Sequence, residues 1–340
     1  MSSKQLVEVA QAMVAEGKGI LAIDESTGTI KKRLNSVNVE SNESNRRAYR
    51  DMLLTTQGLG EHISGAILYD ETIRQSALDG TPFTEVMSAS GVMPGIKVDA
   101  GAHDMAGHPG EKVTEGLDGL RARLEEYSGL GARFAKWRAV ITIGDSIPTS
   151  ACVESNSHAL ARYAALCQEA GIVPMVEPEV LMDGDHSLAT CYEVTEATLR
   201  SLFNQLYDQN VLLEGTILKA SMVISGSEAT DRAGVQEVAE ATISCLLNSV
   251  PAALAGVVFL SGGQSDTEAT AHLDAMNRIG GLPWPLSFSY GRALQAAALS
   301  NWGANPAENV ASAQALLAHR ARMNGLATMG QYDQTMERAA

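Results

Sequence analysis

The strongest constraint on the fold is a repeated alternation of short apolar runs with longer amphipathic stretches. Alternating strands and crossover helices imply parallel strands, since each helix returns the chain to the same edge. Eight such units in 340 residues match the usual size of a (β/α)8 barrel, although a doubly wound open sheet has the same local alternation. We therefore expect a (β/α)8 barrel. The eight apolar runs lie at residues 19–24, 63–69, 93–98, 132–143, 172–180, 215–222, 256–260 and 286–290.

Both ends of the chain extend this repeat. Apolar residues in the segment 4–16 recur at the spacing of one helical face, and Gly17 follows as a stop signal. This predicts an extra N-terminal helix before the first strand, and the residues beyond the eighth strand predict a C-terminal helical extension. Pro and Gly are dispersed and no charge block interrupts the sequence. Residues 1–340 are therefore expected to form a single domain.

Composition excludes several classes of protein. Lys and Arg total 25 and Asp and Glu total 40, which gives a formal net charge of −15. Nucleic acids and anionic membranes select clustered positive charge, so neither is an expected partner. No run of about 18 apolar residues is present, as a membrane helix would need, and the first residues do not resemble a secretory signal. The four cysteines form no CxxC pair, which favours reduced thiols in a cytoplasmic protein.

Charged residues gather where the expected strands end. Residues two apart on a strand share a face, so three pairs should each point the same way. Facing the helices, these charges would be buried unpaired at a cost of several kcal/mol. An inward-facing, mutually paired cluster at the carboxyl ends of the strands is therefore expected, which is where barrels carry their active sites. The pairs are Lys97 with Asp99, Lys136 with Arg138 and Glu177 with Glu179, joined by Asp24 and Lys219.

Lysines among carboxylates point to amine chemistry. Neighbouring cations lower the pKa of a lysine and leave a neutral amine that can attack a carbonyl. A nearby carboxylate can then move protons during formation and hydrolysis of the Schiff base. Such a reaction needs no cofactor.

Two groups of residues predict phosphate binding on opposite sides of the barrel mouth. The loops after the seventh and eighth strands contain Ser261-Gly262-Gly263 and Gly291-Arg292. Glycines let backbone N–H groups approach an anion, and barrels often bind phosphate at these two loops. A second cationic group, formed by Lys97, Arg138 and Arg33, suggests a substrate with a phosphate at each end.

Two segments invite a metal-site interpretation that their spacing does not support. His103, Asp104 and His108 lie in a Gly-rich segment that we expect to be a solvated loop, because a His-x4-His spacing on a loop does not place two imidazoles on one helical face. Residues 183–186 begin like a calcium loop, but Val194 occupies the twelfth position in place of Glu. No metal site is predicted.

These residues belong to motifs that resemble the class I fructose-bisphosphate aldolases over nearly the whole chain. The matching blocks are GKGILA at 17–22, DESTG at 24–28, GIKVD at 95–99, FAKWR at 134–138, GIVP at 171–174, VEPE at 176–179, LEGT at 213–216, FLSGGQS at 259–265 and FSYGRALQ at 288–295.

The resemblance implies reversible cleavage of fructose 1,6-bisphosphate to dihydroxyacetone phosphate and glyceraldehyde 3-phosphate, in glycolysis and gluconeogenesis. Lys219 would form the imine, Glu177 would shuttle protons and Lys136 would act as a positioned cation. Glu179 would hold the lysine pair, and Asp24 would take the proton of the C4 hydroxyl. The dihydroxyacetone phosphate end would be held by Ser261, Gly262, Gly263, Gly291 and Arg292. The other phosphate would lie near Lys97, Arg138, Ser26, Thr29 and Arg33, with Arg46 as a more distant candidate.

The chain departs from the family pattern in two places. Ala220-Ser221-Met222 follows the imine lysine where the family commonly has Pro-Asn-Met. Many members also end in a tail whose last residue is a tyrosine that assists proton transfer at C3, whereas Tyr332 is the only late tyrosine here. Proton transfer on the enamine is thus expected to be slower or to use another group.

Two alternatives to this function remain open. The chain could be another Schiff-base sugar-phosphate aldolase or transaldolase, or a non-catalytic scaffold. By analogy with the family, we expect a homotetramer.

Overall fold

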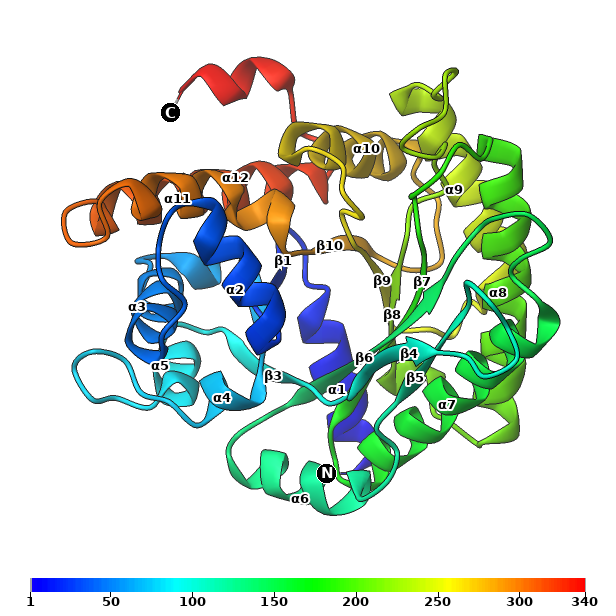
Figure 1. Ribbon diagram of the computed structural model, residues 1–340, viewed down its shortest axis with the longest axis horizontal. Helices are drawn as coiled ribbons and strands as arrows, with labels where there is room; N and C mark the ends of the chain where they lie inside the picture. The colour runs from blue at the N-terminus through cyan, green and yellow to red at the C-terminus, as the bar shows by residue number, and fades with distance from the viewer. Residues whose placement is uncertain (1, 340) are drawn as a thin grey trace.

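The protein is a closed barrel of eight parallel strands, seen down its axis in Figure 1. A computed structural model describes residues 2–339. Around the ring the strand order is β1-β10-β9-β8-β7-β6-β3-β2, which confirms the barrel and excludes the open sheet. The strands are β1 (Gly19–Ala22), β2 (Ile63–Leu68), β3 (Met93–Lys97), β6 (Phe134–Ile141), β7 (Val173–Val180), β8 (Ile217–Ala220), β9 (Gly256–Phe259) and β10 (Leu286–Tyr290).

Helices follow the strands and form the outer layer. The last two helices supply the predicted C-terminal extension, and helix α1 is the predicted N-terminal one. Their bounds are α1 (Ser3–Met13), α2 (Thr27–Ser36), α3 (Glu43–Leu54), α4 (Asp70–Ile73), α5 (Phe83–Ala89), α6 (Leu120–Gly129), α7 (Ser150–Glu169), α8 (Leu188–Asp208), α9 (Val235–Ser249), α10 (Asp266–Ile279), α11 (Arg292–Ala304) and α12 (Val310–Ala327), with short 3-10 turns η1 (Leu59–Glu61), η2 (Leu213–Gly215) and η3 (Gln334–Ala339).

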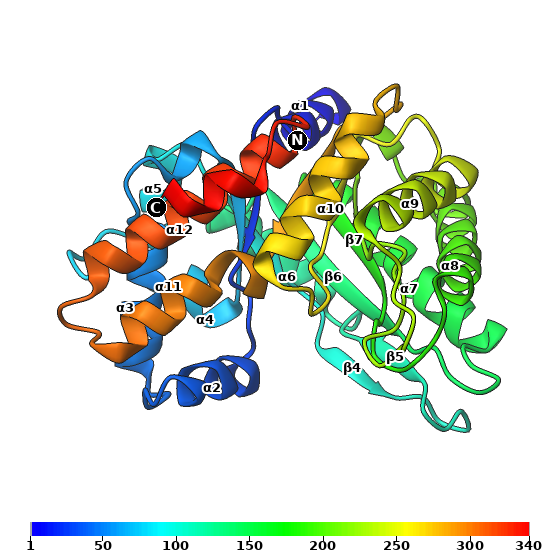
Figure 2. The ribbon, with the colours of Figure 1, turned by 90° about the horizontal axis from the view of Figure 1, so that it is seen from above.

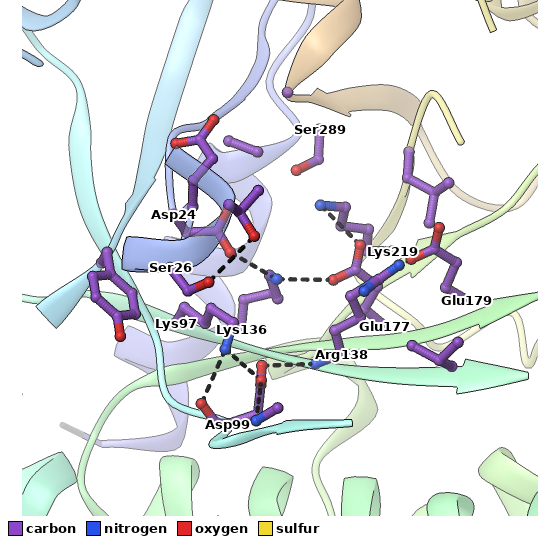
Figure 3. Close-up of a pocket in the computed structure, with 18 of the residues that line it drawn as sticks. Asp24, Ser26, Lys97, Asp99, Lys136, Arg138, Glu177, Glu179, Lys219 and Ser289 are labelled. Atoms are coloured by element: carbon purple, nitrogen blue, oxygen red, sulfur yellow. Dashed lines mark hydrogen bonds and ion pairs between the residues drawn. The ribbon is translucent and has the colours of Figure 1, made fainter. Parts of the chain in front are cut away.

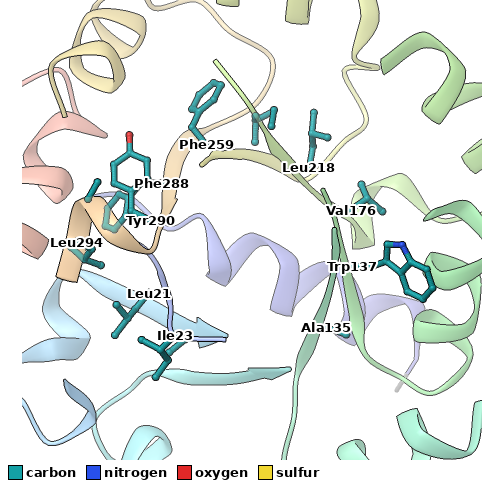
Figure 4. Packing of buried hydrophobic residues seen from close by; sticks show 14 of the residues in the cluster. Leu21, Ile23, Ala135, Trp137, Val176, Leu218, Phe259, Phe288, Tyr290 and Leu294 are labelled. Atoms are coloured by element: carbon teal, nitrogen blue, oxygen red, sulfur yellow. The ribbon is translucent and has the colours of Figure 1, made fainter. Parts of the chain in front are cut away.

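The strands are apolar on both faces because each face is covered. Outward-facing side chains such as Leu21, Trp137 and Leu218 pack under the helices, as Figure 4 shows. Trp137 meets Tyr163 of α7 with ring centroids 5.6 Å apart, so it faces the helices. Inward-facing side chains form a second core, of which Phe134 and Met175 are members.

Helix α1 closes the N-terminal end of the barrel. Its residues Leu6, Ala10 and Met13 are buried and belong to the interior core. Gly256 at the start of β9 permits this approach, since a Cβ atom there would lie 2.8 Å from the Val14 side chain. In Figure 2, α1 lies at one end of the barrel, and α2 and the hairpin of strands β4 (Gly101–Asp104) and β5 (Lys112–Glu115) lie at the other. The mouth at that other end is therefore left for the site.

The solvated loop expected at His103, Asp104 and His108 is wrong for the first two residues, which lie on a strand, whereas His108 lies in the turn that follows it. The segment 101–115 forms an antiparallel hairpin of β4 (Gly101–Asp104) and β5 (Lys112–Glu115). Lys112 pairs with Asp104 across the strands, and Asn156 of α7 accepts a hydrogen bond from the backbone N–H of Thr114 at 3.1 Å. The glycines that suggested a loop fall at the turn and at the hairpin ends.

Across residues 2–339, no group of three or more His, Cys, Asp or Glu side chains is arranged to hold a metal ion. None of the helices in that range combines the length and apolar character needed to cross a membrane. All four cysteines are free and buried.

Candidate active site

A pocket of about 420 Å³ opens at the carboxyl ends of the barrel strands. Side chains from widely separated parts of the chain converge on it, as Figure 3 shows. The sequence-predicted residues that line it are Asp24, Ser26, Thr29, Arg33, Lys97, Lys136, Arg138, Glu177, Glu179, Lys219, Ser261, Gly262, Gly291 and Arg292.

A buried carboxylate joins two lysines at the base of this pocket. Lys219 Nζ lies 2.9 Å from Glu177 Oε1, and Lys136 Nζ lies 3.2 Å from Glu177 Oε2. Lys136 Nζ also pairs with Asp24 Oδ2 at 2.7 Å. The lysines and Glu177 are only 3–4% exposed. Because they stand on three consecutive strands of the ring, β6, β7 and β8, the backbone fixes their mutual positions.

Glu179 does not hold the lysine pair, contrary to the expectation from sequence. Its carboxylate accepts from Arg138 Nε. The strand register explains the difference, since Val176 is level with Leu218 and Glu177 is therefore level with Lys219. Glu179 stands two residues nearer the mouth, about 7 Å along the strand.

Close pairing of opposite charges keeps Asp24, Glu177 and Lys136 in their charged forms. Burial alone would raise the pKa of Asp24, but the charges of Lys136 and Lys219 hold it well below its usual value. Glu177 is affected in the same way by Lys136, Lys219 and Arg138, and its pKa is lowered. For Lys136, burial is outweighed by Asp24 and Glu177, so its pKa is raised. Lys136 is thus a fixed cation, and the expected lowering by neighbouring cations does not apply to it.

The lowered pKa of Asp24 leads to a pH-dependent stability. A carboxyl with a lowered folded-state pKa stabilises the fold above its ordinary pKa, and this contribution is lost as the pH falls through the folded-state value. Asp24→Asn lacks the contribution at every pH. We therefore expect the free energy of unfolding of the parent to exceed that of Asp24→Asn most at neutral pH, with a smaller difference below about pH 4. Urea unfolding at both pH values measures this, and a constant difference would contradict it.

A second set of ion pairs forms the wall next to the hairpin. Lys97 Nζ pairs with Asp99, whose other oxygen accepts from the Arg138 backbone N–H at 3.2 Å. The N–H of Gly101, at the start of β4, also donates to Asp99 at 3.1 Å. Asp99 therefore ties Lys97 to the hairpin. The sequence identified this aspartate as a pair partner and omitted it from the site.

Arg33 lies beside the loop that follows β10. Its Nη2 atom is 3.6 Å from where a Cβ atom of Gly291 would lie. Barrel closure is the reason, because β1 pairs with β10 and so α2, after β1, adjoins the loop after β10. Arg33 pairs with Glu25, which also binds Arg50 at 2.5 Å. Glu25 also lines the pocket and was not predicted as a site residue, although it directly follows Asp24.

The loops after β9 and β10 lie next to each other at the pocket. Gly262 and Gly263 have φ values of +59° and +109°, which L side chains seldom adopt. Gly263 does not itself line the pocket, but a Cβ atom there would lie 3.5 Å from Arg292 Nη2. On the other side, Ser26 Oγ and Thr29 Oγ1 are hydrogen-bonded at 3.2 Å.

The pocket lining differs from the sequence prediction at three further residues. Arg46 is turned away to Glu71, with its Nε 2.9 Å from Oε2, and is absent from the pocket lining. Tyr69 and Ser289 do line the pocket, and neither was predicted. Ser289 Oγ is buried and has no hydrogen-bond partner among the described residues. Both stand at the carboxyl ends of strands, the position that could have identified them.

A (β/α)8 barrel with a buried lysine–carboxylate cluster at its mouth defines a class of enzymes in which a lysine amine attacks a carbonyl. Cations around that amine and the glycines of the loops after β9 and β10 suit an anionic substrate.

Comparisons with known proteins identify the family. The family model described as Fructose-bisphosphate aldolase class-I matches residues 5–340. A probable fructose-bisphosphate aldolase class 1 from Xanthomonas axonopodis is 67% identical over 98% of this chain and 99% of its own. Fructose-bisphosphate aldolase 5, cytosolic, from Arabidopsis thaliana is 51% identical over 96% of this chain and 91% of its own.

A solved structure agrees with these matches. It is a ternary co-crystal structure of fructose-bisphosphate aldolase from Plasmodium falciparum in complex with TRAP and a small-molecule inhibitor. It superimposes with a TM-score of 0.95 at 48% identity, and covers 97% of this chain and 95% of that one. This chain belongs to the class I fructose-bisphosphate aldolase family. It is a metal-independent lyase that reversibly cleaves fructose 1,6-bisphosphate through a lysine Schiff base.

Proposed function

We propose that Lys219 is the lysine that forms the Schiff base, with Glu177 as its proton shuttle. The main support for this assignment is the 2.9 Å contact between Lys219 Nζ and Glu177 Oε1. Lys219 adds its amine to the C2 carbonyl of the ketose to give a carbinolamine. Glu177 moves the protons that convert the carbinolamine hydroxyl into leaving water, and an imine remains. Lys136, kept charged by Asp24 and Glu177, stabilises the developing negative charge.

Cleavage then proceeds from the protonated imine. Asp24 accepts the proton of the C4 hydroxyl as the C3–C4 bond breaks, and its lowered pKa keeps it ionised for this step at neutral pH. The bond's electron pair moves into the imine, so an enamine of dihydroxyacetone phosphate stays on Lys219 and glyceraldehyde 3-phosphate leaves. Protonation of the enamine at C3 and addition of water release the second product and restore the amine.

The two phosphates would occupy opposite sides of the pocket. Ser261, Gly262 and Arg292, joined by Arg33 beside Gly291, suit the dihydroxyacetone phosphate end. Lys97 and Arg138, with Ser26 and Thr29, suit the other phosphate. Lys97, Arg138 and Arg33 each pair with a carboxylate, and Arg292 stands beside the glycine turn after β9.

Tyr332 is a poor candidate for proton transfer at C3. Its hydroxyl donates to Glu337 Oε1 at 2.8 Å, and its backbone N–H donates to Asp274 Oδ1 at 2.8 Å. It lines a different pocket, next to α10. A group within the catalytic pocket, or water, would therefore protonate the enamine.

We also propose the broader features that the family resemblance implies. These are a cytoplasmic location, a homotetrameric assembly, and a single domain of residues 1–340. The name of the Arabidopsis relative gives a cytosolic location for that protein. Closure of all eight strands into one ring supports the single domain.

Borohydride trapping tests the assignment of the imine lysine. With dihydroxyacetone phosphate and a chelator present, we expect reduction to leave one covalent adduct, and peptide mapping to place it on Lys219. The chelator should not reduce its yield. An adduct on Lys136 or Lys97, or loss of trapping with the chelator, would overturn the proposal.

A further inference from the structure

The turn after β9 has little intrinsic rigidity. Gly262 and Gly263 both have positive φ, and glycine is the residue with the largest backbone freedom to lose on ordering. One hydrogen bond closes the turn, from the Gln264 backbone N–H to the Ser261 carbonyl at 2.9 Å. The turn must nevertheless hold its backbone N–H groups toward a phosphate. Ordering the turn therefore requires a further contact next to it.

The Gln264 side chain supplies this constraint through helix α10. Gln264 is 7% exposed and points inward, where its Oε1 lies 2.6 Å from Nδ1 of His272, itself 2% exposed. Burial lowers the pKa of His272 to about 4, so the imidazole is neutral at pH 7. Its Nδ1–H then donates to Gln264 Oε1, because an amide oxygen can only accept.

The same side chain reaches the strand that carries the imine lysine. Gln264 Nε2 donates to Met222 Sδ at 3.5 Å. Met222 is 1% exposed and follows Lys219 by three residues. One buried amide thus connects α10, the turn after β9 and the segment after β8. The motif around Lys219 departs from the family at Ala220 and Ser221 but keeps this methionine.

We propose that Gln264 and His272 are positioning residues, which hold the turn Ser261–Gly263 in its phosphate-receiving conformation and at a fixed distance from Lys219. This inference rests on the function proposed above for the turn and for Lys219. Neither residue lines the pocket, so both act through the backbone of the turn. Their effect should be confined to ligands that carry a phosphate.

The test compares two ketones in His272→Leu, which removes the donor. Dihydroxyacetone phosphate and dihydroxyacetone form the same imine, and only the first carries a phosphate. We expect the concentration of dihydroxyacetone phosphate needed for half-maximal borohydride trapping to rise about tenfold, as for loss of one buried hydrogen bond. The KM for fructose 1,6-bisphosphate should rise with it while kcat changes little, and trapping by dihydroxyacetone should be unchanged.

Conservative variants separate positioning from general damage. Asn at 272 offers an amide N–H close to where Nδ1–H stood, so His272→Asn should restore most of the phosphate affinity. Should His272→Leu fail to fold, Gln264→Met keeps the side-chain length without the acceptor and carries the same expectation. An unchanged affinity for dihydroxyacetone phosphate, or an equal loss for both ketones, would overturn the proposal.

Arg292→Ala distinguishes failure of this inference from failure of the proposed function. It should weaken binding of dihydroxyacetone phosphate and leave dihydroxyacetone unaffected. If Arg292→Ala has this effect and His272→Leu has none, only the positioning role is wrong. If Arg292→Ala has no effect either, the phosphate assignment is wrong, and the positioning proposal is wrong with it.

Discussion

Lys219→Ala should abolish cleavage of fructose 1,6-bisphosphate while the barrel remains folded. No other group can form the imine from the same position, so kcat should fall by at least about 10⁴-fold, as expected when a nucleophile is removed. The fold should persist because Glu177 keeps Lys136 as its partner, 3.2 Å away. Steady-state cleavage measures the loss, and circular dichroism with thermal melting checks the fold.

Lys136→Ala is the matched control. Lys136 and Lys219 are both buried, both are lysines and both contact Glu177, so a general effect of removing a buried cation would appear in either variant. We expect Lys136→Ala to lose activity yet still yield a borohydride adduct on Lys219, whereas Lys219→Ala should yield no adduct. Appreciable cleavage by Lys219→Ala, or an adduct on Lys136 in that variant, would show that the nucleophile has been misassigned.

The eight strands were predictable because a barrel covers both of their faces. A parallel strand covered on both faces is apolar at nearly every position, as the fully buried runs Ile63–Leu68 and Val173–Val180 show. Such runs stand out from flanking sequence without any knowledge of their partners. The charged residues within them were equally conspicuous, because Lys136, Glu177 and Lys219 interrupt buried strands.

The pairing of those charges was not predictable. Which carboxylate meets Lys219 depends on the register between β7 and β8, and a single strand contains no information on its register. The position of Arg33 depends on closure between β1 and β10, residues nearly the whole chain apart. The sequence could therefore assign residues to the mouth of the barrel, but not to the partners that they contact there.

The hairpin β4–β5 was missed for a different reason. His103 and Asp104 are exposed, so no apolar periodicity marks the strands. Its order comes from cross-strand pairing and from Asn156 of α7, which donates to the Lys112 carbonyl at 2.9 Å. A prediction based on hydrophobic periodicity cannot detect a strand that is held by polar contacts to a distant helix.

Glu177→Gln should slow imine formation more than any other carboxylate change in the pocket. The amide cannot accept and return a proton, which costs about 10²–10⁴-fold in rate for a general acid–base group. It also leaves the two buried lysines without the charge they share. We expect kcat to fall within that range, and single-turnover borohydride trapping with dihydroxyacetone phosphate to slow in proportion.

Glu179→Gln provides the control, because it tests the sequence expectation against the structure. Glu179 is on the same strand and accepts from Arg138 rather than from a lysine. Its loss should alter the KM for fructose 1,6-bisphosphate through Arg138, while the trapping rate on Lys219 falls by less than about tenfold. Equal slowing of trapping in the two variants would mean that Glu179 also holds the lysine pair during the reaction. The register of β7 against β8 would then not determine which carboxylate serves the amine.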